Sequence, residues 1–157
     1  MLYAGVDPGH KGGVCVLEDD KLIYLAPLTK GNFFAAVDLC PSYGTMICCL
    51  EKVHAMPKQG SVSMFTFGEG YGWLKGVMDS LQIRYQEIAP QTWKKEFGLN
   101  SEKTKSVEVA KQLYPEADLI PEGCRKEQDG LAEALLMAVY ARRMFTTMLT
   151  AHRKISI

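Results

Sequence analysis

The sequence predicts an α/β domain built on a mixed five-stranded sheet that is flanked by helices. Three short apolar segments follow one another closely at the start of the chain, which is typical of an antiparallel three-strand meander. Two further apolar runs are separated by segments with helical periodicity, as in sheets whose strands are linked by helices. The 157 residues suffice for one domain with a real core. We therefore expect a single domain over 1–157, with about 12 residues frayed at its end.

The first half of the chain supplies four of the expected strands. Strands are expected over 2–7, 14–17 and 22–25, with a glycine-rich loop after the first and an acidic turn after the second. A short helix is expected over 32–39, with its phenylalanines turned inward. The nearly continuous apolar run 45–51 predicts a strand that is covered on both faces.

The second half is mainly helical. The elements expected here are a helix over 64–81, a strand over 84–88, and helices over 90–97, 101–113 and 128–145. Pro90 is suited to the first position of its helix, and Ser101 is suited to cap the next one. A meander followed by strands that alternate with helices is the pattern of the ribonuclease H-like fold.

The composition fits a soluble globular protein, with 47% hydrophobic and 23% charged residues. The 18 basic and 18 acidic residues give a formal net charge of zero, which alone does not favour a nucleic-acid partner. Two bound divalent cations would raise this charge to about +4, and the basic residues are grouped in pairs, which strengthens the local field. No apolar stretch approaches the roughly 18 residues that span a bilayer.

The expected compartment follows from the cysteines and from the start of the chain. The five cysteines are odd in number and lack paired spacing, so we expect reduced core thiols rather than disulfides. We expect no secretory signal before the first strand. The expected location is the cytoplasm, without a membrane partner.

Four acidic residues occupy positions where a buried core normally has an apolar side chain. Asp7 ends the first strand, Glu51 ends the run 45–51, and Asp129 and Glu133 lie four apart at the head of an apolar helix. Burying an ionised carboxylate costs several kcal/mol unless it is paired or binds a metal. Carboxylates that converge from separate elements commonly hold divalent ions for phosphodiester chemistry. The sequence therefore predicts a metal-dependent nuclease.

Each acid also has a plainer interpretation. The sequence Asp-Pro-Gly at position 7 is a common turn, and Glu51 could be an exposed strand end paired with Lys52. Asp129 complements the positive end of its helix dipole. This explanation suits Glu133 less well, because an apolar helix with one lone acid is unusual. The four acids together favour the site.

Four segments of the chain together resemble RuvC-type Holliday-junction resolvases, with the closest likeness to the short bacteriophage branch. They are 5–13, 50–57, 63–68 and 129–136. The resemblance covers residue 3 to about residue 143. It implies the ribonuclease H-like fold, a homodimer, and cleavage of branched DNA with Mg²⁺ or, as a substitute, Mn²⁺.

By position, the resemblance implies that the metal ligands are Asp7, Glu51, Asp129 and Glu133, with two ions per site. One departure from the family pattern concerns the last pair. Bacterial cellular members have two aspartates three apart, whereas Asp129 and Glu133 are four apart. The longer glutamate side chain can offset this shift, and which of the two matches which family ligand stays open.

The resemblance also implies residues that contact DNA. Lys105 is the first candidate for a lysine that stabilises charge at the scissile phosphate, followed by Lys94 or Lys95. Phe65 or Phe67 could insert into the centre of the junction, although core packing is an alternative for at least one of them. The DNA-binding candidates are Lys52, His54, Lys58, Phe65, Phe67, Lys94, Lys95 and Lys103.

The expected reaction is in-line attack of water on a DNA phosphodiester, with Asp7 as the ligand that bridges two ions. Without metal, the clustered carboxylates should raise the pKa of at least one of them. The expected substrates are four-way junctions, forks and flaps. A homodimer would place two sites on opposite strands of a junction, and the glycine-rich helix over 64–81 is the candidate contact.

Three alternatives remain open at this point. The first is a ribonuclease H that acts on RNA–DNA hybrids with the same fold. The second is an ATP-using phosphotransferase, which the short chain with one glycine loop disfavours. The third is a non-catalytic module that binds branched DNA. Substrate preference and cleavage with Mg²⁺ would separate them.

Overall fold

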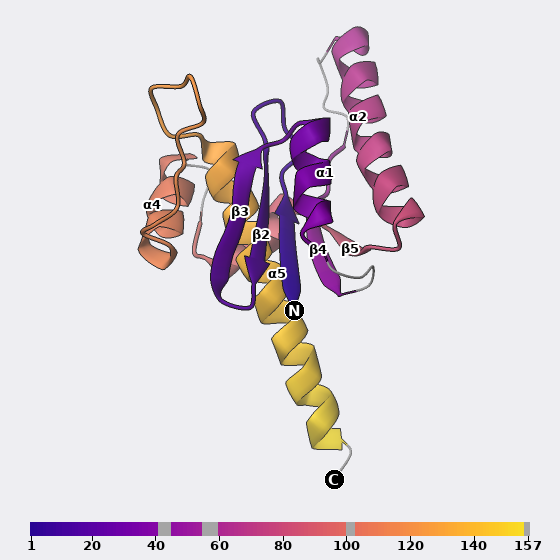
Figure 1. The fold of residues 1–157 in the computed structure, drawn as a ribbon, viewed down its shortest axis with the longest axis vertical. Helices are drawn as coiled ribbons and strands as arrows, with labels where there is room; N and C mark the ends of the chain where they lie inside the picture. Colours follow the sequence, from indigo (N-terminus) through magenta and orange to yellow (C-terminus); the bar gives the residue numbers. More distant parts are fainter. Residues whose placement is uncertain (41–44, 55–59, 100–102, 156–157) are drawn as a thin grey trace.

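In the computed structural model the chain forms three layers, with one sheet between two groups of helices (Figure 1). The structure describes residues 1–40, 45–54, 60–99 and 103–155, without the side chains of 103–104 and 148–155. The strands are β1 (Leu2–Val6), β2 (Gly13–Glu18), β3 (Lys21–Pro27), β4 (Met46–Glu51) and β5 (Arg84–Ile88). The helices are α1 (Lys30–Asp38), α2 (Ser61–Ser80), α3 (Pro90–Glu96), α4 (Lys103–Leu113) and α5 (Asp129–Ile155).

The sheet has the mixed topology that the sequence predicts. Its strand order is β3-β2-β1-β4-β5. The first three strands form the antiparallel meander, and β4 and β5 extend it in parallel with β1. Val6 is the partner of Leu50 in the β1–β4 register, so the carboxyl ends of these two central strands lie at the same edge of the sheet.

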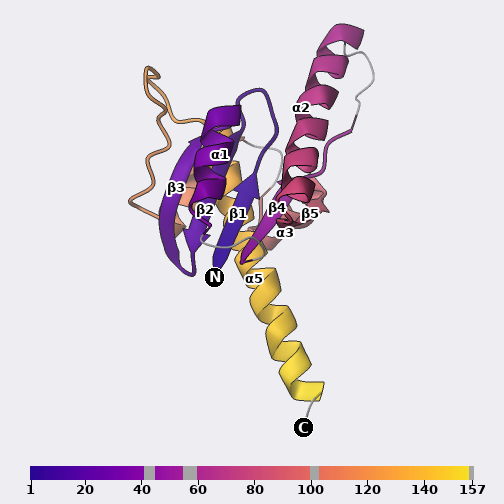
Figure 2. The ribbon, with the colours of Figure 1, turned by 45° about the vertical axis from the view of Figure 1, so that its right-hand side comes forward.

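The two faces of the sheet are covered by different helices. Helices α1 and α2 pack on the face that carries Val6 and Leu50, whereas α3, α4 and α5 contribute to the core on the face that carries Tyr3 and Cys49. The two views place α5 behind the sheet, with α1 in front (Figures 1 and 2). Alternate residues of β1 and β4 therefore face α5.

Helix α5 lies against β1 because two glycines allow a close approach. A Cβ at Gly5 would collide with the backbone of Ala134 and Ala138 on α5, and a Cβ at Gly130 would collide with the backbone of Lys11. The loop after β1 and the first turn of α5 are thus in backbone contact. This packing brings the start of α5 to the carboxyl edge of the sheet.

The bounds of several helices differ from the prediction, most of all those of α2 and α5. Helix α2 begins at Ser61 rather than at residue 64, because Gly60 supplies the extended residue before the first turn. Helix α5 continues to Ile155, so the predicted end near Phe145 is wrong. The hydroxyls of Thr146 and Thr147 each donate, at 2.9 Å, to the carbonyl four residues earlier, and the backbone stays helical beyond the sheet (Figure 1).

Some expectations about burial also change. Phe34 was predicted to point inward, but it is 45% exposed and packs edge-on against Trp73. Cys15, Cys48 and Cys49 are free core thiols, whereas Cys124 is exposed. Across the described part of the chain, no helix is both long and apolar enough to cross a membrane.

Candidate functional site

Asp7 and Glu51 emerge side by side at the carboxyl edge of the sheet. Asp7 directly follows β1, and Glu51 is the last residue of the neighbouring parallel strand β4. Tyr3 and Cys49 belong to the core on the α5 side, and side chains two apart on a strand share a face. Asp7 and Glu51 therefore turn towards α5.

Asp129 and Glu133 approach the same edge from α5. Asp129 is the first residue of the helix, and Glu133 lies one turn later on the same side. The Glu133 side chain is only 13% exposed, and the helix residues that follow it, from Ala134 to Ala141, are buried. The predicted burial of this helix is confirmed, with Glu133 as the acid inside it.

The buried Asp7 carboxyl is influenced electrostatically by the other three acids. Asp7 is 8% exposed, and its Oδ1 accepts a 2.9 Å hydrogen bond from the Gly9 N–H. Burial raises the pKa of the Asp7 carboxyl to about 7, the Gly9 hydrogen bond opposes this rise, and Glu51, Glu133 and Asp129 add to it. We name these four residues, Asp7, Glu51, Asp129 and Glu133, the acidic cluster.

Helix α3 supplies a hydrogen-bond donor to Glu51. The indole Nε1–H of Trp93 donates to Glu51 Oε2 at 2.9 Å, and the Trp93 side chain is completely buried. The pKa of the Glu51 carboxyl is raised, chiefly by burial and to a smaller extent by Glu133. The Trp93 hydrogen bond and the Lys94 charge oppose this rise. The Glu51 carboxylate is therefore held in a fixed orientation next to another acid.

Glu133 receives two contacts from neighbouring helices. The Lys94 ammonium of α3 lies 2.8 Å from Glu133 Oε1, and the buried Ser106 hydroxyl of α4 donates to the same oxygen at 3.3 Å. No role was predicted for Trp93 or Ser106. The available signal was positional, since α3 begins two residues after β5, whose carboxyl end shares this edge.

The other predicted DNA-binding residues differ in how far they are exposed. Lys105 is partly buried on α4, one residue before Ser106. Phe65 is 71% exposed near the start of α2, whereas Phe67 is half-buried. The exposed candidates are Lys52, His54 and Lys95. Lys58 and the side chain of Lys103 lie outside the described residues.

The acidic cluster fits Mg²⁺ or Mn²⁺ in the type of its donors. All four side chains offer carboxylate oxygens, which hard divalent cations prefer, and burial and the other three acids raise the pKa of Asp7. In the described ranges, no three Asp, Glu, His or Cys side chains are arranged to hold one ion as they stand. Lys94 brings a positive charge to Glu133.

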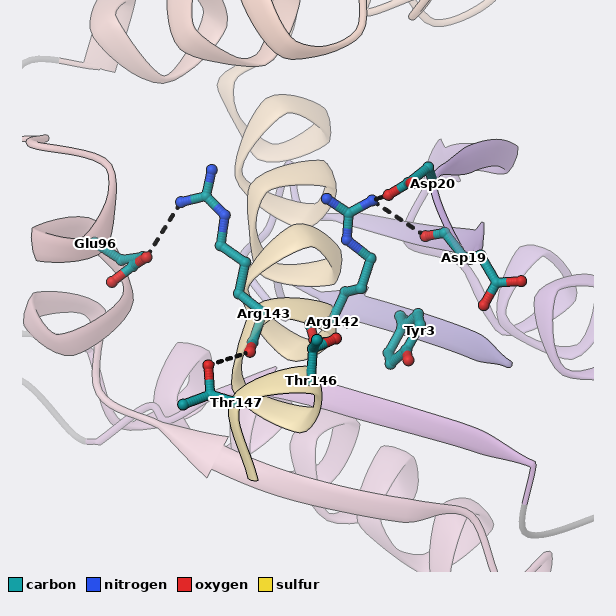
Figure 3. Close-up of a pocket in the computed structure, with 8 residues that line it drawn as sticks. All are labelled: Tyr3, Asp19, Asp20, Glu96, Arg142, Arg143, Thr146 and Thr147. Carbon is teal, nitrogen blue, oxygen red and sulfur yellow. Dashed lines mark hydrogen bonds and ion pairs between the residues drawn. The ribbon is translucent and has the colours of Figure 1, made fainter. Parts of the chain in front are cut away.

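A surface hollow of about 590 Å³ lies at the other end of the sheet, around the second half of α5 (Figure 3). Its lining residues are Tyr3, Asp19, Asp20, Glu96, Arg142, Arg143, Thr146 and Thr147. Arg142 pairs with Asp20, and Arg143 lies 3.2 Å from Glu96. Because each guanidinium already has a carboxylate, this hollow gives no sign of an unsatisfied ligand site.

Comparison with known proteins supports the fold. No protein-family model matches the sequence, and no curated protein matches it. Solved structures do match, among them Thermus thermophilus RuvC in complex with a Holliday junction substrate, at 14% identity and a TM-score of 0.61, covering 92% of this chain and 96% of that one. A second is Thermus thermophilus RuvC, at 15% identity and a TM-score of 0.60, covering 96% and 97%. The RuvC-like, ribonuclease H-like fold is confirmed.

Proposed function

We propose that this chain is a divalent-metal-dependent endonuclease that cuts Holliday junctions and other branched DNA. The observation that carries the proposal is the acidic cluster itself. A carboxylate that is 8% exposed, with a pKa raised to about 7 by burial and by three other acids, is costly in a protein that has no use for it. A divalent cation would remove that cost.

In the proposed site Asp7 and Glu51 would hold the cations from the sheet, while Glu133 and Asp129 would hold them from α5. Two such cations, when bound, lower the pKa of the attacking water and neutralise the leaving oxygen of a phosphodiester. The rigid strands beneath Asp7 and Glu51 fix the distance between their carboxylates. The Gly9 N–H and the Trp93 N–H orient one oxygen of each.

The choice of substrate rests on surface features near this edge. Lys94 and Lys105, from α3 and α4, are the lysines proposed to meet the scissile phosphate. Phe65 is exposed near the start of α2, and this end of α2 extends beyond the sheet on the side where the carboxyl ends of β1 and β4 lie (Figure 1). We assign to Phe65 the insertion into the junction centre. One solved structure of similar fold is described as a complex with a Holliday junction substrate.

A homodimer through α2 completes the proposal. Added Cβ atoms at Gly68, Gly70, Gly72 and Gly76 would meet no atom within 4 Å, so these glycines leave open faces on the helix. A second helix could approach α2 closely there, and a two-fold dimer matches the symmetry of a four-way junction. Light scattering after size-exclusion chromatography should give the mass of a dimer rather than that of a monomer. The bacteriophage branch, to which the four sequence segments bear the closest likeness, and a site of action in the cytoplasm are further parts of the proposal.

A cleavage assay tests the function. The substrates are a four-way junction, a fork, a flap, a linear duplex and an RNA–DNA hybrid, each with Mg²⁺ and with EDTA. We expect Mg²⁺-dependent cuts in the branched DNA, with little or no cutting of the linear duplex. Preferential cutting of the hybrid would instead support the ribonuclease H alternative. Junction binding without any cutting in Mg²⁺ or Mn²⁺ would support a non-catalytic module.

A further inference from the structure

Helix α3 places two different groups on two members of the acidic cluster. The Trp93 indole N–H donates to Glu51 Oε2 at 2.9 Å, and the Lys94 ammonium lies 2.8 Å from Glu133 Oε1. The Lys94 ammonium also lies 5.1 Å from the centre of the Trp93 ring. The hydrogen-bond donor, the ammonium and the two carboxylates thus form one connected unit.

The Lys94 ammonium takes the role of a counter-ion inside the cluster. It forms the ion pair with Glu133 and also acts electrostatically on Glu51, which Glu133 repels. A divalent cation bound to the same Glu133 oxygen would stand close to this ammonium. Like charges a few ångströms apart in a partly buried site repel strongly, so the ammonium and the cation compete for one carboxylate.

We propose that Lys94 is a built-in counter-ion that a divalent cation displaces from Glu133, while Trp93 keeps Glu51 in place as a positioning residue. The inference rests on the proposed metal-dependent function and deepens it. In the metal-free protein, Lys94 neutralises Glu133 and limits the repulsion within the cluster. Once the cation takes Glu133, the ammonium is released next to the cluster, where the phosphate of bound DNA would lie.

This exchange couples two steps that are otherwise independent. In the metal-free protein the Lys94 ammonium is paired with Glu133, and a DNA phosphate would draw it away from that carboxylate. Cation binding therefore makes Lys94 available for DNA, and DNA that takes up Lys94 makes Glu133 available for the cation. By linkage, the affinity of each ligand rises in the presence of the other. Trp93 takes no part in the exchange, because its N–H donates to Glu51 rather than to Glu133. This hydrogen bond can therefore persist while Lys94 moves.

The first test measures Mn²⁺ affinity without DNA by isothermal titration calorimetry. We expect Lys94→Met to bind Mn²⁺ about tenfold more tightly than the unchanged protein, because the competing ammonium is gone. Lys95→Met is the matched control, since it removes the same charge from the next, exposed residue; its affinity should change less than about twofold. Equal or weaker binding by Lys94→Met would overturn the exchange.

The same titration separates the two proposals. If the unchanged protein binds Mn²⁺ and Lys94→Met binds it no better, the exchange is wrong and the metal site stands. If none of the three proteins binds Mn²⁺ at millimolar concentration, the proposed metal site is wrong and the exchange falls with it. Thermal melts establish that each variant is folded, and Lys94→Gln replaces Lys94→Met if the methionine variant does not fold.

The second test uses the two tryptophans. Trp73 lies in the other core, against Phe33 and Phe34, so Trp73→Phe leaves Trp93 as the single indole. In that background Mg²⁺ should shift the Trp93 emission as the ammonium leaves the ring, and adding Lys94→Met should remove at least half of the shift.

The positioning role of Trp93 is tested by Mn²⁺ affinity. Trp93→Phe should weaken Mn²⁺ binding about tenfold, whereas Trp73→Phe should leave it unchanged. Equal Mn²⁺ affinities in the Trp93→Phe and Trp73→Phe proteins would overturn the positioning role, and an undiminished emission shift in the Lys94→Met protein would overturn the displacement.

Discussion

Two stretches of α5 carry charged side chains, but they balance them differently. At the start of the helix, Asp129 and Glu133 act electrostatically on the buried Asp7, and Lys94 pairs with Glu133. Near the middle of the helix, Arg142 and Arg143 each pair with a carboxylate on an open surface (Figure 3).

This difference in burial separates a candidate functional site from ordinary surface ion pairs. Exposed, matched pairs such as Arg143 with Glu96 cost little and contribute little. At the start of α5, by contrast, the acids are largely buried, and burial together with neighbouring carboxylates raises the pKa of both Asp7 and Glu51. Buried carboxylates with raised pKa values are typical of sites where a ligand or a reaction uses them.

The largest expected effect is on cleavage. Asp7→Asn, Glu51→Gln and Glu133→Gln should each lower the junction cleavage rate at least about a thousandfold, because an amide keeps the volume of the side chain but loses the charge that holds Mg²⁺. Junction binding should persist or tighten, because the site becomes less negative. Asp20→Asn, at the other end of the sheet, is the control and should cut at the original rate. A near-normal rate in any of the three variants would remove that residue from the site.

The lysines should affect rate more than affinity. Lys105→Ala should lower the single-turnover cleavage rate about a hundredfold while changing junction affinity only a few fold, because one charge aimed at the transition state matters more than one phosphate contact among many. Arg143→Ala removes the same charge near the middle of α5 and should leave the cleavage rate unchanged. If Lys105→Ala weakens binding at an unchanged rate, the role in the chemical step passes to Lys94 or Lys95.

The buried acid should also control the stability of the metal-free protein. The pKa of Asp7 rises from 3.8 to about 7 on folding, so between these values the folded state holds more protons than the unfolded state. Stability therefore falls as the pH rises through this window, and the full cost is present above it. Asp7→Asn should stabilise the protein in EDTA at pH 8 by about 2–4 kcal/mol and have little effect at pH 4.

Urea unfolding at the two pH values measures this difference. The unchanged protein should lose stability from pH 4 to pH 8 relative to the variant, and Mg²⁺ should restore part of the loss at pH 8 because it binds only the folded state. If Asp7→Asn is no more stable than the unchanged protein at pH 8, the pKa of Asp7 is not raised in the folded protein as inferred.

The smallest effect on stability is expected for the ion pair between Arg142, near the middle of α5, and Asp20. Arg142→Ala should change the free energy of unfolding by less than about 1 kcal/mol, because its partner Asp20 is exposed and solvent screens the pair. Cleavage should not change. A loss of several kcal/mol, or a loss of cleavage, would show that the hollow around Arg142 has a role beyond surface charge.

Much of this arrangement follows from local sequence patterns. The apolar runs predict the strands, and strand alternation turns Asp7 and Glu51 to one face. The all-round apolar helix predicts the burial of Glu133. These inferences succeed because each depends on the residues of one element or of two paired strands, where spacing alone decides which side a residue faces.

The remaining details depend on packing between elements that are distant in sequence. Trp93 and Glu51 are 42 residues apart, and their hydrogen bond exists only because α3 folds over the carboxyl edge of β4. The pairing of Glu133 with Lys94 has the same cause, because it joins α5 to α3. The extension of α5 to Ile155 was missed because residues past Phe145 lack the apolar pattern that marks the buried part of the helix.

The most direct test of the contrast is to locate Mn²⁺ in a crystal of the protein by its anomalous scattering. The account predicts Mn²⁺ bound at about 2.1 Å to carboxylate oxygens of Asp7 and Glu51, with the Lys94 ammonium moved away from Glu133. It also predicts no Mn²⁺ among Asp19, Asp20 and Glu96. An acidic cluster without Mn²⁺ at millimolar concentration, with Lys94 still on Glu133, would contradict the account.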